Sequence, residues 1–403
     1  MKTFDHVLVG AGIIGLTTAL ELIRQGSSAR DIAIVDPSPI SGASWVAGGM
    51  LAPVAEVQYG QEELYPLMVR AADLWPELVA YVHARTDLPT GFREESTLVV
   101  AADRADATHL SELMDHQKHH GMDVQRIPTR QARRLEPGLS PQLSGAVEIP
   151  GDHQINPRLF CAAAVDVLTT AGVTVITAAA TELVFESDGI AGSEDNKCAG
   201  VMLSGGEKVG VGRTVYLCNG LGANEVEGAP QLPLRPVRGD LVRLAVPEGL
   251  PAPVDRVIRG FVEDRPIYVI PRTDGTIAVG ATSREDDRQS PSVDGVYTLL
   301  RDAIRVVPGL EECEFIEALA GARPGTPDDL PLLGKVGQNV VVSNGYFRHG
   351  ILLSALGAKV GAVLGLTETG EVNGPNGALE TASKAVEVDM SACALDRFNN
   401  EGV

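Results

Sequence analysis

Residues 4–15 read Phe-Asp-His-Val-Leu-Val-Gly-Ala-Gly-Ile-Ile-Gly, an apolar run that leads directly into a G-x-G-x-x-G turn. A strand, a glycine turn and a helix in this order seat a dinucleotide pyrophosphate at the helix N-terminus. Gly10 permits the tight turn, Gly12 lets the backbone approach a phosphate, and Gly15 lets the helix pack closely on the strand. The stretch therefore predicts a nucleotide-binding α/β domain.

An acidic residue follows at the spacing that this motif requires. The apolar run 31–35 ends at Asp36, about twenty residues beyond the turn. Asp36 can accept hydrogen bonds from both ribose hydroxyls of an adenosine, and its charge disfavours a 2′-phosphate. Because strand, helix and acid are in register, a dinucleotide site is favoured over a merely structural turn. The motif alone does not choose between NAD and FAD.

Length and composition indicate a large globular protein. The chain has 403 residues, for which two or three packing units are expected. Hydrophobic residues make up 44% and charged residues 21%, without a disordered or fibrous bias. Asp and Glu outnumber Lys and Arg by 53 to 33, and the net charge of −20 would repel nucleic acid and anionic membranes. A small zwitterionic substrate is the more compatible partner.

The five cysteines are odd in number, widely spaced and without a C-x-x-C pair. This pattern indicates neither a disulfide framework nor a zinc site, so we expect reduced core thiols. One lysine precedes the first strand, and no signal-peptide pattern is found there. We therefore expect a cytoplasmic protein that binds neither nucleic acid nor membrane, and homo-oligomerisation stays open.

Hydrophobic periodicity gives the order of the elements. Helices are predicted over 62–83, 105–120, 157–171 and 350–366, and buried strands over 172–176, 214–220 and 339–345. The nucleotide-binding elements are thus scattered over three parts of the chain. Alternating strand patterns, as at 240–244 and 267–271, fill the intervening segments and indicate a second domain inserted into the first.

The expected domain limits follow from this distribution. We expect a Rossmann-like nucleotide-binding domain and an inserted antiparallel-sheet domain for the substrate, followed by a mobile tail. Their limits are 1–90, 146–225 and 321–366 for the first domain, 91–145 and 226–320 for the second, and 367–403 for the tail.

Three further stretches carry a specific resemblance. They are residues 47–53 (Ala-Gly-Gly-Met-Leu-Ala-Pro), residues 268–272 (Tyr-Val-Ile-Pro-Arg) with Gly-Ala-Thr at 280–282, and residues 321–328 (Gly-Ala-Arg-Pro-Gly-Thr-Pro-Asp) followed by 345–353 (Gly-Tyr-Phe-Arg-His-Gly-Ile-Leu-Leu). With them the chain resembles the flavoprotein amine oxidases of the D-amino-acid oxidase family, and most of all the glycine oxidases of thiamine biosynthesis. The resemblance spans nearly the whole chain, selects FAD as the cofactor, and implies a glutathione-reductase-like FAD-binding domain.

The resemblance also implies which residues contact FAD. Besides Gly10, Gly12 and Gly15, they are Ile13, Ile14, Val35, Asp36, Ala43, Ser44, Gly48, Gly49, Met50, Tyr346, Phe347, Arg348, His349, Gly350, Ile351 and Leu352. Met50 would lie beside the isoalloxazine ring, and the last seven residues would close over its pyrimidine edge. The N-terminus of the last helix would there place partial positive charge near the ring.

The same comparison assigns the substrate side of the site. Arg323 would pair with a substrate carboxylate, Tyr268 would donate a hydrogen bond to it, and Arg348 would lie close by. A planar guanidinium matches a carboxylate bidentately, so the residue types fit this role. Taken without the resemblance, Arg323 could instead pair with Asp328 or Asp329, and Tyr268 on an alternating strand could be a core residue.

The reaction implied by the resemblance is hydride transfer from the substrate α-carbon to flavin N5. The resulting imino acid hydrolyses, and O2 reoxidises the flavin to yield hydrogen peroxide. This chemistry needs positioning of a neutral amine rather than a protein nucleophile or a metal. A covalent flavin would need a nearby Cys or His. Since Cys313 precedes the relevant motif and His349 is the only neighbour, noncovalent FAD is expected.

Two departures from the family pattern affect the substrate pocket. Trp45-Val46 stands where small residues are usual, and Pro266 stands where a glycine oxidase of this pattern has a histidine close to the flavin. Glycine, sarcosine, a D-amino acid and a specialised amine therefore all remain candidate substrates. So does a flavin dehydrogenase, and the residues alone also permit an NAD-dependent dehydrogenase or a flavin-binding module without oxidase activity.

Three histidines on one predicted helix are the only metal-like pattern. His116, His119 and His120 stand at i, i+3 and i+4. Without a further ligand in the sequence pattern, a solvated helix face is favoured over a metal site.

Overall fold

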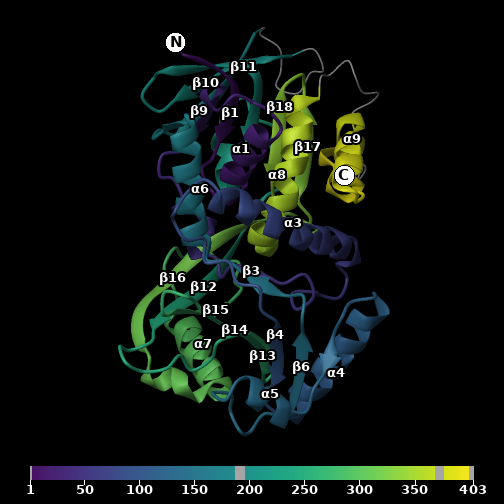
Figure 1. Cartoon of the computed structure of the whole chain (residues 1–403). Coiled ribbons are helices and arrows are strands. Elements are labelled where there is room, and N and C mark those ends of the chain that lie inside the picture. The colour runs from purple at the N-terminus through teal and green to yellow at the C-terminus, as the bar shows by residue number, and fades with distance from the viewer. Residues whose placement is uncertain (1, 187–195, 368–375, 399–403) are drawn as a thin grey trace.

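Two eight-stranded sheets, the first in the upper half of Figure 1 and the second in the lower half, organise the chain. The computed structural model describes residues 2–186, 196–367 and 376–398. The longer helices are α1 (Ile13–Arg24), α3 (Tyr65–His83), α4 (Arg104–His119), α6 (Pro157–Ala171), α7 (Val293–Val306), α8 (Gly350–Leu366) and α9 (Gly377–Val386). Two shorter helices are α2 (Ala43–Val46) and α5 (Thr129–Leu135).

The first sheet has the order β17-β18-β11-β1-β2-β8. Its strands are β1 (Thr3–Val9), β2 (Ile32–Val35), β8 (Thr174–Ile176), β11 (Lys208–Leu217), β17 (Leu332–Val336) and β18 (Val340–Asn344), and the antiparallel pair β9 (Ala180–Phe185) and β10 (Cys198–Leu203) extends it from β11. β18, β11, β1, β2 and β8 are parallel neighbours. Their carboxyl ends therefore meet at one edge, where α/β sheets bind ligands.

The second sheet has the order β16-β12-β15-β14-β13-β4-β6-β5 and is antiparallel except for the β13–β4 pair. Its strands are β4 (Thr97–Ala101), β5 (Gln125–Arg126), β6 (Gly145–Ile149), β12 (Arg235–Ala245), β13 (Val257–Val262), β14 (Arg265–Pro271), β15 (Thr276–Gly280) and β16 (Glu314–Gly325). A small pair, β3 (Met50–Leu51) with β7 (His153–Gln154), lies between the sheets. The Rossmann-like fold with an inserted, mainly antiparallel second sheet is confirmed.

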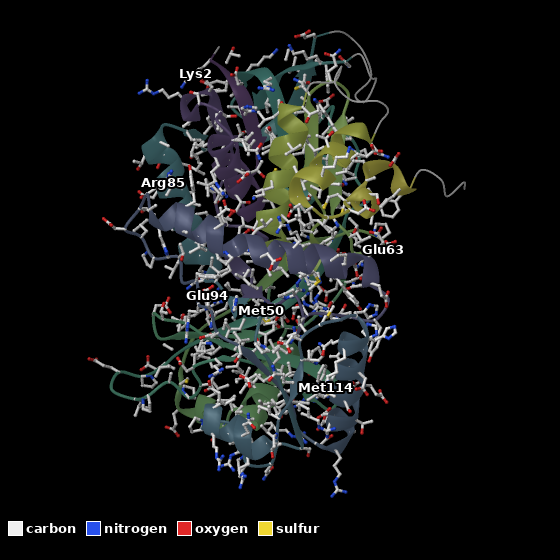
Figure 2. The ribbon with its side chains drawn as sticks, turned by 45° about the vertical axis from the view of Figure 1, so that its right-hand side comes forward. Lys2, Met50, Glu63, Arg85, Glu94 and Met114 are labelled. Carbon is white, nitrogen blue, oxygen red and sulfur yellow. The ribbon has the colours of Figure 1, made fainter. Side chains whose placement is uncertain are left out.

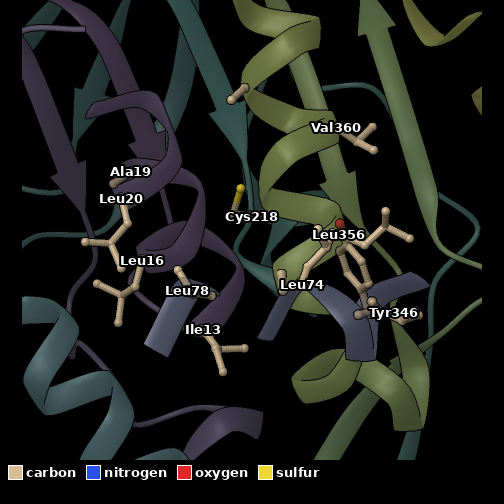
Figure 3. Close-up of a cluster of buried hydrophobic side chains, with 14 of the residues drawn as sticks. Ile13, Leu16, Ala19, Leu20, Leu74, Leu78, Cys218, Tyr346, Leu356 and Val360 are labelled. Atoms are coloured by element: carbon tan, nitrogen blue, oxygen red, sulfur yellow. The ribbon is translucent and has the colours of Figure 1, made fainter. Parts of the chain in front are cut away.

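A helical layer covers the first sheet and holds the main core. Leu16 and Leu20 of α1, Leu74 and Leu78 of α3 and Leu356 of α8 belong to this core, and Figure 3 labels them. Residues Phe347–Leu366 are long and apolar enough to cross a membrane by length and composition alone, but 78% of that window is buried. A helix that is apolar on all sides and packed against neighbouring helices is a core helix.

Local signals explain where these helices begin and end. Asp103 caps α4 in a capping box with Asp106, and Asn156 caps α6 by accepting the Arg158 N–H. α6 ends at Gly172, whose φ of 107° only glycine adopts at low cost. The helices predicted over 62–83, 105–120, 157–171 and 350–366 are therefore confirmed, with one-turn shifts at most.

The sheets place two domain limits later than expected. β6 pairs with β4 and β5, and β16 pairs with β12 along its whole length. The limits expected at 146 and 321 thus fall inside strands of the second sheet, because hydrogen-bonded pairing rather than composition decides to which sheet a strand belongs. All five cysteines are free; four are buried and Cys313 is half-buried.

The expectation of a mobile tail is wrong for residues 376–398. α9 and two short 3-10 turns, Ser391–Cys393 and Leu395–Phe398, pack there against α8 and β17. Leu379, Ala382 and Val386 join the main core at helical spacing. This segment folds because its apolar residues find a partner surface that its own sequence does not reveal. Tail residues 368–375 and 399–403 lie outside the described ranges.

Candidate active site

A cavity of about 670 Å³ lies between the two sheets. It is lined by every residue that the sequence assigns to the site except Gly15, namely Gly10, Gly12, Ile13, Ile14, Val35, Asp36, Ala43, Ser44, Gly48, Gly49, Met50, Tyr268, Arg323, Tyr346, Phe347, Arg348, His349, Gly350, Ile351 and Leu352. Figure 2 shows Met50 at the junction of the two halves. The carboxyl ends of the parallel strands form one end of the cavity, and the face of the second sheet forms the other.

The three motif glycines serve three different purposes. Gly10 has a φ of 109°, and a Cβ there would lie 2.7 Å from the Cys218 carbonyl oxygen. A Cβ on Gly15 would collide with the Gly10 carbonyl, so Gly15 permits the close packing of α1 on β1. At Gly12 a Cβ would meet only the Ser44 hydroxyl, at 3.4 Å. The space over Gly12 is thus left open by the protein, as a phosphate cradle requires.

Asp36 and Ser44 hold the backbone around this cradle. The Asp36 carboxylate accepts hydrogen bonds from the Ala11 N–H at 2.7 Å and the Ser38 N–H at 2.8 Å. The Ser44 hydroxyl accepts from the Ile13 N–H, at the N-terminus of α1, at 3.0 Å. Each carboxylate oxygen has a second lone pair, so Asp36 can still accept ribose hydroxyls. The acid therefore both shapes the glycine turn and offers acceptors to a nucleotide.

The other end of the cavity is built on paired strands of the second sheet. Tyr268 on β14 lies directly opposite Arg259 on β13 and Gly280 on β15. A Cβ on Gly280 would collide with the Tyr268 ring, and one on Gly48 would lie 2.9 Å from its hydroxyl. Burial raises the pKa of Tyr268. The ring is therefore clamped between glycines with a protonated hydroxyl at the cavity.

Arg323 has no carboxylate partner in the described part of the chain. Its guanidinium lies over Gly239 and makes a single long hydrogen bond, to the Thr282 carbonyl at 3.4 Å. The two acids that could have paired with it are engaged elsewhere. Asp328 binds Arg397 at 2.7 Å, and Asp329 binds Arg235 at 2.7 Å. Burial lowers the pKa of Arg323, so this cation occupies an environment that favours an incoming anion.

Arg348 differs from Arg323 because it already has a counter-ion. It pairs with Glu56 at 3.2 Å, and Glu56 also forms a close ion pair with Arg259. Glu56 and Arg259 both line the cavity, with side chains 10% and 8% exposed. Burial lowers the pKa of Arg259, yet a guanidinium beside a carboxylate remains charged. One acid thus balances two cations and leaves Arg323 free.

Glu56 and Arg259 could not be assigned from the sequence. Glu56 follows the small-residue stretch that precedes α3, and Arg259 stands inside the apolar strand β13. The one sequence signal for a functional role is the presence of a charged residue in an apolar strand, because a buried charge must have a partner.

His349 and the start of α8 close the cavity. Burial first, and then the Arg348 charge, lower the pKa of His349 well below its usual range, so its imidazole is neutral. Its buried Nε2 atom has no hydrogen-bond partner within the described residues. The first turn of α8 directs unpaired N–H groups to the same region, which gives it partial positive charge.

Of the three residues that depart from the family pattern, Val46 and Pro266 line the cavity and Trp45 does not. Trp45 is 39% exposed, and the Arg158 guanidinium lies over its ring, 3.7 Å from the ring centroid. The change at Trp45 therefore affects the surface, whereas Pro266 offers no polar group to a ligand.

Comparison with known proteins assigns the chain to a family. Residues 5–364 match the DAO family, described as FAD dependent oxidoreductase. The chain belongs to this family. Its cofactor is accordingly FAD, which rules out the NAD-dependent alternative.

Individual relatives are similar over most of the chain. The bifunctional protein ThiO/ThiG of Trichormus variabilis is 32% identical over 372 residues, which cover 88% of this chain and 52% of that protein. The chain thus spans about half the length of such bifunctional relatives. A Rhizobium etli protein, named as a thiamine biosynthesis oxidoreductase ThiO, is 30% identical over 365 residues, with 90% and 96% covered. The crystal structure of glycine oxidase from Geobacillus kaustophilus has a TM-score of 0.79 at 26% identity, covering 98% and 99% of the two chains.

The residues present fit FAD. The open space over Gly12 accommodates a pyrophosphate, and the acceptors of Asp36 suit a ribose. The orphaned Nε2 of His349 and Oδ1 of Asn219 are buried polar atoms at the cavity wall that a bound ligand can satisfy. The chain is therefore an FAD-dependent oxidoreductase of the DAO family that is similar to glycine oxidase and ThiO proteins.

Proposed function

We propose that the protein oxidises glycine, or another small amino acid or amine, by hydride transfer from the substrate α-carbon to noncovalent FAD, with O2 reduced to hydrogen peroxide. The observation that carries the proposal is the unpaired guanidinium of Arg323 beside the Tyr268 hydroxyl. A partly buried cation that lacks a protein carboxylate is a binding site for a substrate carboxylate.

The chain's own groups orient the substrate. The Arg323 guanidinium binds the carboxylate through two parallel N–H groups, and the Tyr268 hydroxyl donates a third hydrogen bond. This clamp fixes the α-carbon, which loses a hydride while the neutral amine loses a proton to solvent. The resulting imine is hydrolysed by water to an oxo acid and ammonia. Positioning of this kind supplies much of the rate acceleration, so no protein nucleophile is required.

The cavity offers both polar and apolar groups to a substrate. Arg323, Tyr268 and the Glu56–Arg348 pair contribute polar groups to its wall, and Met50 and Leu241 contribute apolar ones. A pocket rejects an extra methylene by only about 1–3 kcal/mol, so related small amino acids are expected to compete with glycine.

The test is a substrate panel on the FAD-loaded enzyme. Glycine, sarcosine, D-alanine and a carboxylate-free amine are compared under air for peroxide release, and without oxygen for bleaching of the oxidised flavin. We expect peroxide and bleaching with one or more of the amino acids. Bleaching without peroxide would instead identify a dehydrogenase, and bleaching by the carboxylate-free amine alone would contradict the carboxylate clamp.

The name of the Rhizobium etli relative supports a role in thiamine biosynthesis as part of this proposal. Growth of a thiamine-requiring strain that lacks its own glycine-oxidising enzyme tests it. Restoration by the wild type, and no restoration by an Arg323→Ala variant, is the expected result.

A further inference from the structure

Three potential metal ligands from different parts of the chain meet outside the cavity. His116 and His120 stand one turn apart on α4, and Glu62 belongs to the 3-10 turn Glu62–Leu64 that precedes α3. One ligand atom of each residue lies within 4.8 Å of the others. Figure 2 shows Glu63, the neighbour of Glu62, at this end of α3, with Met114 of α4 below it. The cluster therefore connects the helical layer of the first sheet with a helix of the second.

His116 is not a freely solvated side chain, contrary to the helix face expected from the sequence. Its ring contacts the Tyr59 ring, with centroids 4.5 Å apart, and its Nε2 lies 2.9 Å from the Tyr65 hydroxyl. That hydroxyl donates its proton to the Gln58 carbonyl, so it accepts the hydrogen bond from His116. Nε2 then carries the proton, and Nδ1 holds the free lone pair. Orientation of a histidine through its second nitrogen is characteristic of metal ligands.

Glu62 is also held in place. Its carboxylate accepts the Gly60 N–H at 3.1 Å. The third ligand is therefore an oriented carboxylate, the feature that the sequence pattern lacked.

We propose that Glu62, His116 and His120 bind a divalent transition-metal ion, with Zn²⁺ as the type ion. Two imidazoles and one carboxylate are a donor set of zinc proteins, and the exposure of Glu62 and His120 leaves room for water as a further ligand. The ion ties α4 to the segment that carries Glu56 of the active site. α4 already holds this segment at one point, where Gln117 donates to the Val54 carbonyl at 2.9 Å.

The test measures metal binding to the FAD-loaded protein. Equilibrium dialysis against Zn²⁺, followed by elemental analysis, is expected to give one ion per chain. His120→Ala should lower the affinity by more than about 100-fold, because loss of even an outer partner of a metal site costs 10–100-fold. His119→Ala is the matched control, since it removes the adjacent histidine of the same helix but not a ligand, and its affinity should stay unchanged.

Further variants keep the result interpretable. Glu62→Gln should weaken binding as His120→Ala does, whereas Glu63→Gln should not. Flavin content and circular dichroism of each variant report whether it is folded. Equal binding by His119→Ala and His120→Ala, absence of binding by the wild type, or half an ion per chain with dimer formation would each overturn the proposed site.

Discussion

Replacement of Arg323 is the most direct test of the active site. In the structure its guanidinium lies across Gly239 on the neighbouring strand and has one 3.4 Å hydrogen bond, to Thr282. Arg323→Ala therefore removes almost no interaction within the protein, and the fold and FAD content should be retained. What it removes is the partly buried guanidinium that we propose as the bidentate partner of the substrate carboxylate.

The size of the effect follows from this environment. Truncation of one partner in a desolvated charge pair costs about 2–5 kcal/mol. Since about 1.4 kcal/mol corresponds to a factor of ten, kcat/KM for amino acids should fall by about 30-fold to several thousand-fold. Arg323→Lys should recover only part of this loss, because an ammonium cannot reproduce two parallel N–H groups.

The assay compares kcat/KM for an amino acid with that for a carboxylate-free amine. Binding of acetate, followed through the flavin spectrum, gives a second readout that needs no turnover. Arg238→Ala is the matched control: Arg238 lines the same cavity, but its guanidinium binds the Asp286 carbonyl at 2.8 Å and Gln289 at 3.1 Å. Equal losses on both substrates, or unchanged acetate affinity in Arg323→Ala, would refute the carboxylate clamp.

Three further predictions concern the glycine turn, the ion pairs of Glu56 and the buried carboxyl group of Asp152. Gly12→Ala should fold but lose most of its FAD affinity, because the added Cβ fills the phosphate cradle. Gly15→Ala should instead lower the melting temperature of the apoprotein, because its Cβ collides with the Gly10 carbonyl. A fully flavinated Gly12→Ala protein would contradict the role of Gly12. Glu56→Gln leaves two cations unpaired, so denaturant titration should show that the free energy of unfolding falls by about 3–5 kcal/mol. Glu63→Gln, at an exposed site, is the control, and an equally high denaturation midpoint for both variants would disprove this prediction. Burial raises the pKa of Asp152 from 3.8 to about 7. The folded protein then holds a proton that the unfolded chain releases, so this group's contribution to stability is full below pH 3.8 and is lost as the pH rises through about 7. Denaturant titrations at several pH values should show that Asp152→Asn removes this dependence, and parallel curves for both proteins would argue against it.

The nucleotide end of the site could be predicted because its requirements are local. Glycine is required at positions 10, 12 and 15 by the backbone conformation and by close contacts within one strand-turn-helix unit. A short stretch of sequence is therefore enough to predict this unit. Long periodic helices were predictable for the same reason, because the spacing of apolar residues records which face is buried. The resemblance added Arg323, Tyr268 and Arg348, all of which line the cavity.

Interactions that depend on distant segments were decided only by the tertiary structure. Glu56 meets Arg259 across about half the chain because β13 and the segment before α3 face the same cavity. Asp328 pairs with Arg397 and Asp329 pairs with Arg235, and these arginines come from two other segments. Because both acids are paired, Arg323 is left without a carboxylate partner among the described residues. Local sequence encodes backbone geometry and burial, but a charged side chain acquires its partner only when the packed sheets bring distant residues within hydrogen-bonding distance.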